Sequence, residues 1–401
     1  MSEWQLQTLD SAGIEFIDGD RGKNYPSQDD FLDIGHCLFL STKNVRANGF
    51  DFGDCQFISA EKDELLRKGK LNRGDIVLTT RGTVGNTALY DETVQFEHVR
   101  INSGMVIIRM KPTNVDSSFF LYFLRQLDYT SFVSGSAQPQ LPIRDLKQIE
   151  IALPPLPEQK AIASVLSSLD DKIDLLHRQN KTLEAMAETL FRQWFIEEAK
   201  EDWEECELSE FGHIICGKTP SKSNANYFGN DVPFLKIPDM HGKVFISKTT
   251  DSLSQLGALS QSKKMVPQNS ICVSCIATVG LVCITDCDLQ TNQQINSIVP
   301  NDHRFLYYLY EVMLDMYDEL HNLASGGTAT LNLNTGDFSR IKIAKPDDIT
   351  LLQFNDAVTP LFTKIRSNGC QIQTLENLRD TLLPKLMSGE VRVQYQTEEV
   401  A

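Results

Sequence analysis

The sequence predicts an α+β fold in which two tandem-duplicated α+β domains are separated by two long helices forming an antiparallel coiled coil. Three observations predict it. The chain repeats internally, each half opens with short apolar runs typical of strands, and each half closes with a long apolar stripe at helical spacing. At 401 residues the chain is long enough for more than one buried core.

The repeat aligns the two halves at an offset of 192 to 199 residues, from pairs such as Gln140/Asn332 (332 − 140 = 192) and Trp4/Trp203 (203 − 4 = 199). Residues 140–154 match residues 332–346, and both stretches end in alternating apolar residues followed by a proline, as a strand end does. The repeat predicts a first domain at 1–152, a helical spacer at 153–198, a second domain at 199–345, a second spacer at 346–390 and a tail at 391–401.

Each domain is expected to contain strands broken by Gly, Asn and Pro, as at 75–79 and 105–109, and one helix, at 118–127 and at 305–314. Residues 158–195 then run without Gly or Pro. Their apolar positions recur at intervals of four and three residues, which is typical of a coiled-coil seam. The predicted seam of the first spacer is Ile162, Leu166, Leu169, Ile173, Leu176, Asn180, Leu183, Ala187, Leu190 and Trp194.

The second spacer carries a matching stripe: Phe354, Val358, Leu361, Ile365, Asn368, Ile372, Leu375, Arg379, Leu382 and Leu386. A single stripe more often lies on its own domain, but two equal stripes of this length favour pairing with each other. Antiparallel pairing in which facing residue numbers sum to about 548 sets Asn180 opposite Asn368, and a buried Asn pair fixes the register of a coiled coil. Gly369 and Pro384 are expected to bend or fray the second helix.

The sequence carries no recognisable catalytic motif: no phosphate-binding Gly-rich loop, no nucleophile elbow, no His-Glu-x-x-His and no Asn-Pro-Pro-Tyr-like tetrapeptide of an adenine methyltransferase. We therefore expect a non-catalytic chain without a cofactor. Cys272, Cys275, Cys283 and Cys287 suggest a zinc site, but at offset 195 the first three fall on Val77, Thr80 and Ala88, which have no strong ligand among them. Core cysteines, and no metal, are the favoured interpretation.

Residues 153–163, Leu-Pro-Pro-Leu-Pro-Glu-Gln-Lys-Ala-Ile-Ala, open the first spacer, and Leu-Phe-Arg-Gln-Trp-Phe closes it at 190–195. With the duplication, these stretches resemble the specificity subunit of a Type I DNA restriction-modification system over essentially the whole chain. Residues 346–353 keep only the proline and the glutamine of the motif. The resemblance implies that each domain is a target-recognition domain reading one half of a split DNA sequence, with the helices as spacer.

The resemblance also implies partners: double-stranded DNA, two methyltransferase subunits that supply S-adenosylmethionine, and endonuclease/translocase subunits. DNA-reading side chains should lie on polar loops that can meet base edges and phosphates. The candidates in the first domain are Arg21, Lys23, Asn24, Tyr25, Thr42, Lys43, Asn44, Arg81, Thr83, Ser136, Gln138 and Gln140. Those in the second are Lys218, Thr219, Ser221, Lys222, Lys236, Thr278, Asn292, Gln293, Gln294 and Thr328.

The net charge of −16, from 38 basic and 54 acidic side chains, argues against DNA as the partner of the isolated chain. A coiled-coil protein-binding scaffold without a DNA role is therefore the main alternative, and a zinc-dependent regulator is a third. If the methyltransferase subunits supply cations, the chain alone should bind DNA poorly. A cytoplasmic location is expected, because no signal peptide pattern and no apolar run of ~18 residues is found.

Overall fold

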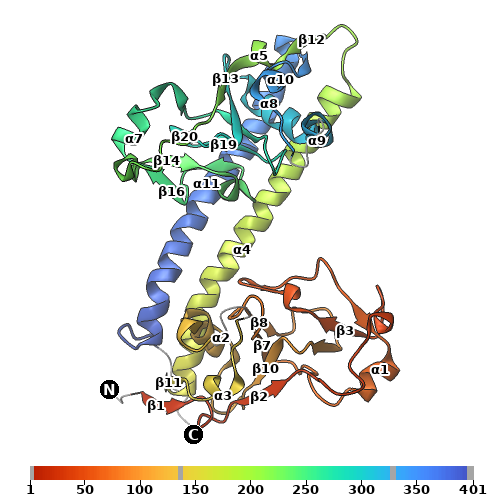
Figure 1. Cartoon of the computed structure of the whole chain (residues 1–401), viewed down its shortest axis with the longest axis vertical. Helices are drawn as coiled ribbons and strands as arrows, with labels where there is room; N and C mark the ends of the chain where they lie inside the picture. The colour runs from red at the N-terminus through yellow and green to blue at the C-terminus, as the bar shows by residue number, and fades with distance from the viewer. Residues whose placement is uncertain (1–3, 134–138, 326–330, 395–401) are drawn as a thin grey trace. The chain divides into compact units, whose positions relative to one another are not determined.

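The computed structural model describes residues 4–133, 139–325 and 331–394 (Figure 1). The chain divides into two compact units. Unit 1 comprises Met1–Lys172 and Leu375–Ala401, and unit 2 comprises Ile173–Thr374. Each unit therefore combines one copy of the repeated domain with segments of both long helices.

Unit 1 contains a four-stranded antiparallel sheet in the order β2-β10-β7-β8, a three-stranded sheet β6-β3-β9, and the two-stranded ribbons β1-β11 and β4-β5. The strands are β1 (Gln5–Thr8), β2 (Glu15–Asp18), β3 (Cys37–Leu40), β4 (Val45–Arg46), β5 (Gly49–Phe50), β6 (Phe57–Ile58), β7 (Asp75–Thr79), β8 (Thr87–Tyr90), β9 (Val99–Ile101), β10 (Met105–Arg109) and β11 (Glu150–Leu153). The helices of this domain are α1 (Ala60–Leu65), α2 (Ser117–Gln126) and α3 (Ile143–Leu146).

The four-stranded sheet of unit 1 is covered on both faces. Alternation along β7 and β10 sends Ile76 and Ile108 into one hydrophobic cluster and Val77 and Ile107 into another. The first cluster is closed by the aromatic face of α2, which begins where the Asp116 side chain accepts a hydrogen bond from the Phe119 amide. Strands buried on both sides explain why these runs are continuously apolar.

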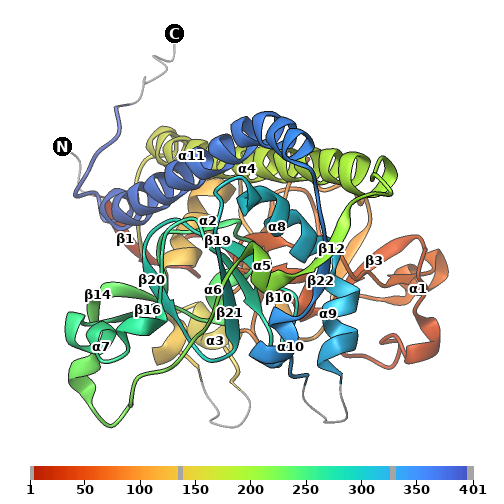
Figure 2. The ribbon, with the colours of Figure 1, turned by 90° about the horizontal axis from the view of Figure 1, so that it is seen from above.

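Unit 2 repeats this plan with a five-stranded sheet β13-β21-β18-β19-β15, a four-stranded sheet β16-β14-β20-β17 and the ribbon β12-β22, and α8 packs on the five-stranded sheet (Figure 2). The strands are β12 (Glu204–Glu207), β13 (Gly212–Cys216), β14 (Phe228–Leu235), β15 (Phe245–Ile246), β16 (Asp251–Leu253), β17 (Met265–Val266), β18 (Ile271–Ser274), β19 (Val282–Thr285), β20 (Leu289–Thr291), β21 (Ile295–Pro300) and β22 (Lys342–Lys345). The helices are α5 (Leu208–Phe211), α6 (Ile237–Met240), α7 (Gln255–Leu259), α8 (Phe305–Asp315), α9 (Tyr317–Ala324) and α10 (Thr335–Ser339).

The two predicted spacer helices are α4 (Leu156–Arg192), continued by a π-helical turn at Gln193–Glu197, and α11 (Asp348–Met387). In unit 2 their segments pair antiparallel in the predicted register. The Asn368 amide donates to Asn180 Oδ1 at 2.8 Å, and the rings of Trp194 and Phe354 lie 6.0 Å apart. Both pairs sum to 548, so the predicted Asn pair is confirmed.

In unit 1, the other segments of α4 and α11 pack on the same cluster as α2. Ile162 and Leu166 of α4 are fully buried there with Leu386 of α11, and Arg379 donates to Asp170 at 2.9 Å. Each stripe is therefore covered both by its partner helix and by a domain. No helix in the described ranges has the length and the hydropathy of a bilayer-spanning segment.

The fraying of α11 expected at Gly369 and Pro384 is wrong, because the helix runs unbroken through both residues. Pro384 lies near the end of the helix, so its missing N–H removes a single backbone hydrogen bond close to the terminus. Its own carbonyl still accepts a bond from the Ser388 amide at 3.0 Å.

A tryptophan ties the ribbon of each domain to the start of a long helix. Trp4 donates its indole N–H to Glu158 of α4 at 3.3 Å, and Trp203 donates to Asp347, directly before α11, at 3.2 Å. The carboxylate of the Pro-Glu-Gln motif at 157–159 is thus replaced in the second copy by an aspartate a few residues earlier in the repeat. The duplicated contact survives although the sequence motif does not.

The Asn180–Asn368 pair, in which Asn368 is buried, should respond differently to single and double replacement. Asn368→Ala removes the donor to both Asn180 and Gln179, and we expect it to lower the free energy of unfolding by about 1–2 kcal/mol. The double variant Asn180→Leu/Asn368→Leu replaces both polar partners and should be neutral or more stable. Urea unfolding of the two variants checks this, and a double variant as unstable as the single one would contradict it.

Candidate nucleic-acid interface

In unit 1, three predicted loops meet at the ends of β7 and β10. The amides of Thr80 and Arg81 both donate to the carbonyl of Gly104, and Thr80 in turn accepts from the Leu141 amide, which brings the chain at Gln140 beside Arg81. The methyl group of Thr42 packs on Gly104, where a Cβ would meet it at 2.9 Å. Loops 41–44, 80–83 and 139–141 therefore form one surface.

Loop 19–25 joins this surface because Gly19 has no side chain. A Cβ at Gly19 would lie 2.3 Å from the carbonyl oxygen of Asn102, so only glycine permits the two backbones to approach this closely. The turn that follows is held by Asp20, whose buried carboxylate accepts the Gly22 amide at 2.7 Å. This hydrogen bond from Gly22 is the main reason why the pKa of Asp20 lies below its usual value.

Unit 2 builds the same surface with different side chains. Cys275 takes the place of Thr80: its amide donates to Gln294, and its carbonyl accepts from Leu333. Gly217 takes the place of Gly19, since a Cβ there would lie 2.0 Å from the Asn292 carbonyl oxygen. Loops 217–222, 275–278 and 292–294 therefore meet as their counterparts do in unit 1.

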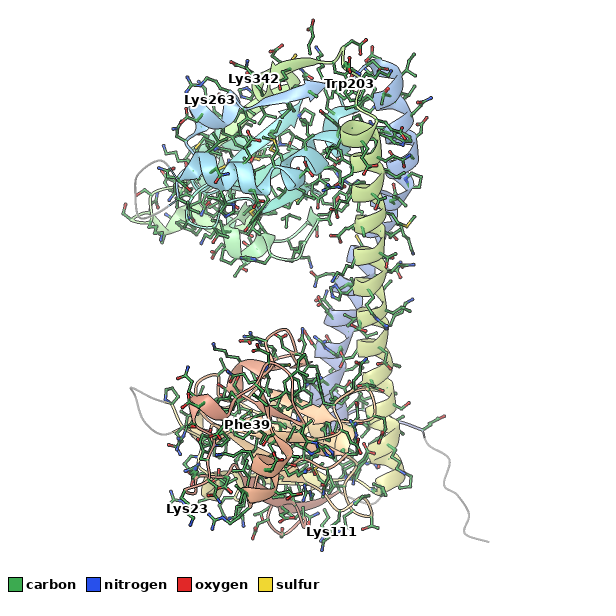
Figure 3. All side chains as sticks on the ribbon, turned by 90° about the vertical axis from the view of Figure 1, so that its right-hand side faces the viewer. Lys23, Phe39, Lys111, Trp203, Lys263 and Lys342 are labelled. Atoms are coloured by element: carbon green, nitrogen blue, oxygen red, sulfur yellow. The ribbon has the colours of Figure 1, made fainter. Side chains whose placement is uncertain are left out.

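Exposed side chains on these surfaces are available for contact with a ligand. Figure 3 shows one of them, Lys23, at the surface of unit 1 and Phe39 in the interior. In the first domain the exposed candidates are Arg21, Lys23, Lys43, Arg81 and Thr83, with Asn24, Tyr25, Thr42 and Gln140 half-buried. In the second, Lys218, Ser221, Lys222, Thr278 and Gln293 are exposed and Thr219, Lys236 and Gln294 are half-buried. Ser136, Gln138 and Thr328 lie outside the described residues.

Two candidates have a structural role instead. Asn44 is 4% exposed, and its amide donates to the carbonyls of Asp51 and Asp54 while its oxygen accepts from Ser41. Asn292 is 7% exposed and bonds through both side-chain atoms to Gln294. The prediction that Asn44 and Asn292 contact DNA is therefore corrected. Asparagine favours turns because its side chain can form hydrogen bonds with nearby groups, and here those hydrogen bonds engage the side chain within its own domain.

Three further candidates are partly occupied within their own domain. Asn24 donates to the Leu65 carbonyl, Thr219 donates to Gln293, and Lys236 forms an ion pair with Asp251. The sequence analysis also missed Arg67 and Lys68, which follow α1 and reach loop 19–25 across more than 40 positions of the chain. The run of basic residues at 67–70 is the sequence feature that could have pointed to them.

Three of the four cysteines of the suspected zinc site belong to two different hydrophobic clusters, and Cys287 belongs to neither of them. Cys272 and Cys283 face each other across β18 and β19, as Val77 and Ala88 do across β7 and β8, whereas Cys275 packs in the cluster beneath α8. Burial raises the pKa of the Cys275 thiol to about 12. Within residues 4–133, 139–325 and 331–394, no three His, Cys, Asp or Glu side chains are grouped as metal ligands would be.

A buried carboxyl of unit 2 lies on α8, outside these loops. Glu311 is 3% exposed, and burial together with Glu188 and Glu184 of α4 and Asp315 of α8 raises its pKa to about 8. A raised pKa means that the folded state holds a proton that the unfolded state has released between pH 4.5 and 8. Stability is therefore retained below that window and lost as the pH rises through it.

This sign gives a measurable prediction. The free energy of unfolding should fall with increasing pH from about 4.5 to 8, at up to about 1.4 kcal/mol per pH unit from this group. Glu311→Gln should remove that dependence and be more stable than the parent at pH 8. Chemical unfolding across this range measures it, and parallel pH profiles for parent and variant would be inconsistent with a buried protonated Glu311.

Comparison with known proteins defines the class. The family model of the Type I restriction modification DNA specificity domain matches residues 11–185 and 200–353, so the chain belongs to the family of Type I restriction-modification specificity subunits. The HindI specificity subunit of Haemophilus influenzae is 32% identical over 98% of this chain and 100% of its own length. The MjaIX specificity subunit of Methanocaldococcus jannaschii is 31% identical over 80% of this chain and 78% of its own.

The fold has a counterpart among solved structures. The S subunit of the Type I restriction-modification system from M. genitalium superposes with a TM-score of 0.59 and 16% sequence identity, covering 96% of each chain. At this identity the likeness concerns the fold.

Proposed function

We propose that this chain is the non-catalytic DNA sequence-recognition subunit of a Type I restriction-modification complex and that each domain reads one half of a split target. The observation that carries the proposal is the duplicated surface. Both units bring the same loops together through the same backbone hydrogen bonds, at Thr80 and Cys275, while the exposed side chains differ. A shared frame with different side chains suits two readers of different half-sites.

The paired helices are proposed to dock two methyltransferase subunits, which bring S-adenosylmethionine, and the complex is proposed to recruit endonuclease/translocase subunits. The spacer is also proposed to set the number of unread base pairs between half-sites. Two relatives named as specificity subunits, matched over 100% and 78% of their own length, support this assignment. The chain itself needs no cofactor in this scheme.

The test is a binding assay with the chain and its co-purifying methyltransferase subunits. Methylated adenines are first mapped in a host that carries the system, which gives the target sequence. The complex should then bind a duplex with that target at least 10³-fold more tightly than one with both half-sites scrambled. Equal affinity for both duplexes would favour the protein-binding scaffold, which the net charge of −16 otherwise supports.

A further inference from the structure

Basic side chains from two distant segments of unit 1 meet at loop 19–25. The Arg67 amide donates to Asp20 at 2.8 Å, and its guanidinium reaches to 3.9 Å from the same carboxylate. A Cβ at Gly22 would lie 2.7 Å from Arg67 Nη2, so the arginine side chain lies directly over the turn. The group formed here, cation cluster 1, consists of Arg21, Lys23, Arg67 and Lys68.

Unit 2 assembles a similar group from the same two parts of the repeat. Gln261, after α7, donates to the Lys218 carbonyl at 2.8 Å, and its own carbonyl accepts from the Lys264 amide at 2.8 Å. The segment that follows α7 is therefore held against the loop that follows β13. The group formed here, cation cluster 2, consists of Lys218, Lys222, Lys263 and Lys264.

The lysines of both clusters keep their charge available, whereas the two arginines of cation cluster 1 each lie beside an aspartate. Arg67 is 77% exposed and its contact with Asp20 is long, and Arg21 lies 3.1 Å from Asp18 at the surface. None of the six lysines forms an ion pair with a carboxylate in the part of the chain that the structure describes. Residues 217–223 and 260–265 contain no acidic residue at all, although the whole chain carries a charge of −16. Concentrated free cations on an acidic protein point to an anionic ligand.

Between the two copies, some positions at the loop surface carry different side chains, while the basic segments after α1 and α7 are alike. The paired positions Arg81 and Ile276, which form equivalent bridges at the loop surface, carry unrelated side chains, although their bridge partners Gln140 and Asn332 are both amides. The segments after α1 and α7, by contrast, both carry adjacent basic residues. Side chains that read sequence must differ between two half-sites, whereas side chains that bind phosphate need not.

We propose that cation clusters 1 and 2 are phosphate-binding clamps that hold the DNA backbone against each reading surface, and that Arg67, Lys68, Lys263 and Lys264 contribute to binding without contributing to sequence choice. This inference rests on the proposed function. Lys and Arg bound to phosphates release condensed counterions, so each contact adds about 0.9 to the slope of log affinity against log salt concentration. The clamps therefore have a signature that base contacts lack.

The experiment measures fluorescence anisotropy of target and scrambled duplexes with the complex of this chain and its methyltransferase subunits, over about a tenfold range of salt concentration. The variants are Arg67→Ala/Lys68→Ala and Lys263→Ala/Lys264→Ala. Each should weaken binding about 10- to 100-fold near 0.1 M salt and reduce the slope by up to about 2, equally for both duplexes. Arg67→Lys keeps the charge and should retain the slope.

The matched controls are Lys111→Ala in unit 1 and Lys342→Ala in unit 2, two exposed lysines outside the clusters (Figure 3). They should leave affinity and slope unchanged. An unaltered slope in both double variants, a loss confined to the target duplex, or an equal loss in the controls would each overturn the inference. If the parent complex does not distinguish the two duplexes, the proposed function fails; if it does and the double variants match it, only the clamps fail.

Discussion

Replacing residues 1–152 with the corresponding domain of another specificity subunit is expected to change one half of the recognised DNA sequence and leave the other half intact. The physical reason is that each unit has its own hydrophobic core and its own proposed reading surface. Each mismatched base pair costs about 1–3 kcal/mol, so the original first half-site should lose at least 10³-fold in affinity. Mapping methylated adenines with the hybrid in place of the parent measures the outcome.

The junction of this exchange needs care, because α4 and α11 contribute to the core of unit 1. Ile162 and Leu386 are buried in the same cluster as Phe119 and Phe120 of α2. The donor domain should therefore carry aromatic or large aliphatic residues at these two positions of α2. A hybrid rebuilt from the parent domain through the same junction is the control. If both half-sites change together, the domains do not read independently.

The architecture was predictable because it depends on periodicity, which the chain displays twice. The helix expected at 118–127 is α2 at Ser117–Gln126, and the helix expected at 305–314 is α8 at Phe305–Asp315. The coiled-coil register followed from one polar pair, Asn180 and Asn368, since any other register would bury these amides against apolar side chains. The offset between copies likewise placed Cys272 and Cys283 on Val77 and Ala88, and the strand registers match.

The interface was less predictable, because it depends on which loops meet. Polar residues in a loop look alike in a sequence whether they face solvent or hold the turn, and Asn44 and Asn292 hold the turn. Arg67 was missed for the opposite reason, since its relation to Gly22 arises only when two backbones meet in the fold. A contact between two segments that are distant in the chain produces no repeating pattern in the sequence.

Gly217→Ala is expected to abolish recognition of the second half-site while sparing the first. The new Cβ would lie 2.0 Å from the Asn292 carbonyl oxygen and 2.5 Å from that of Thr291, and neither backbone atom can move aside as a flexible side chain would. Loop 217–222 must therefore separate from loop 292–294, and the unfolding free energy should fall by about 2–3 kcal/mol. Gly19→Ala, which would meet the Asn102 carbonyl at 2.3 Å, should give the reciprocal loss of the first half-site.

The control for these variants is Gly369→Ala, in α11. A Cβ there has no atom within 4 Å, and alanine favours the helix over glycine by about 1 kcal/mol, so this variant should be slightly more stable and bind normally. Affinity for duplexes with either half-site scrambled, together with thermal unfolding, separates the two effects. If Gly217→Ala weakened both half-sites equally, the loss would reflect global destabilisation, and the glycine contact would not be what assembles one reading surface.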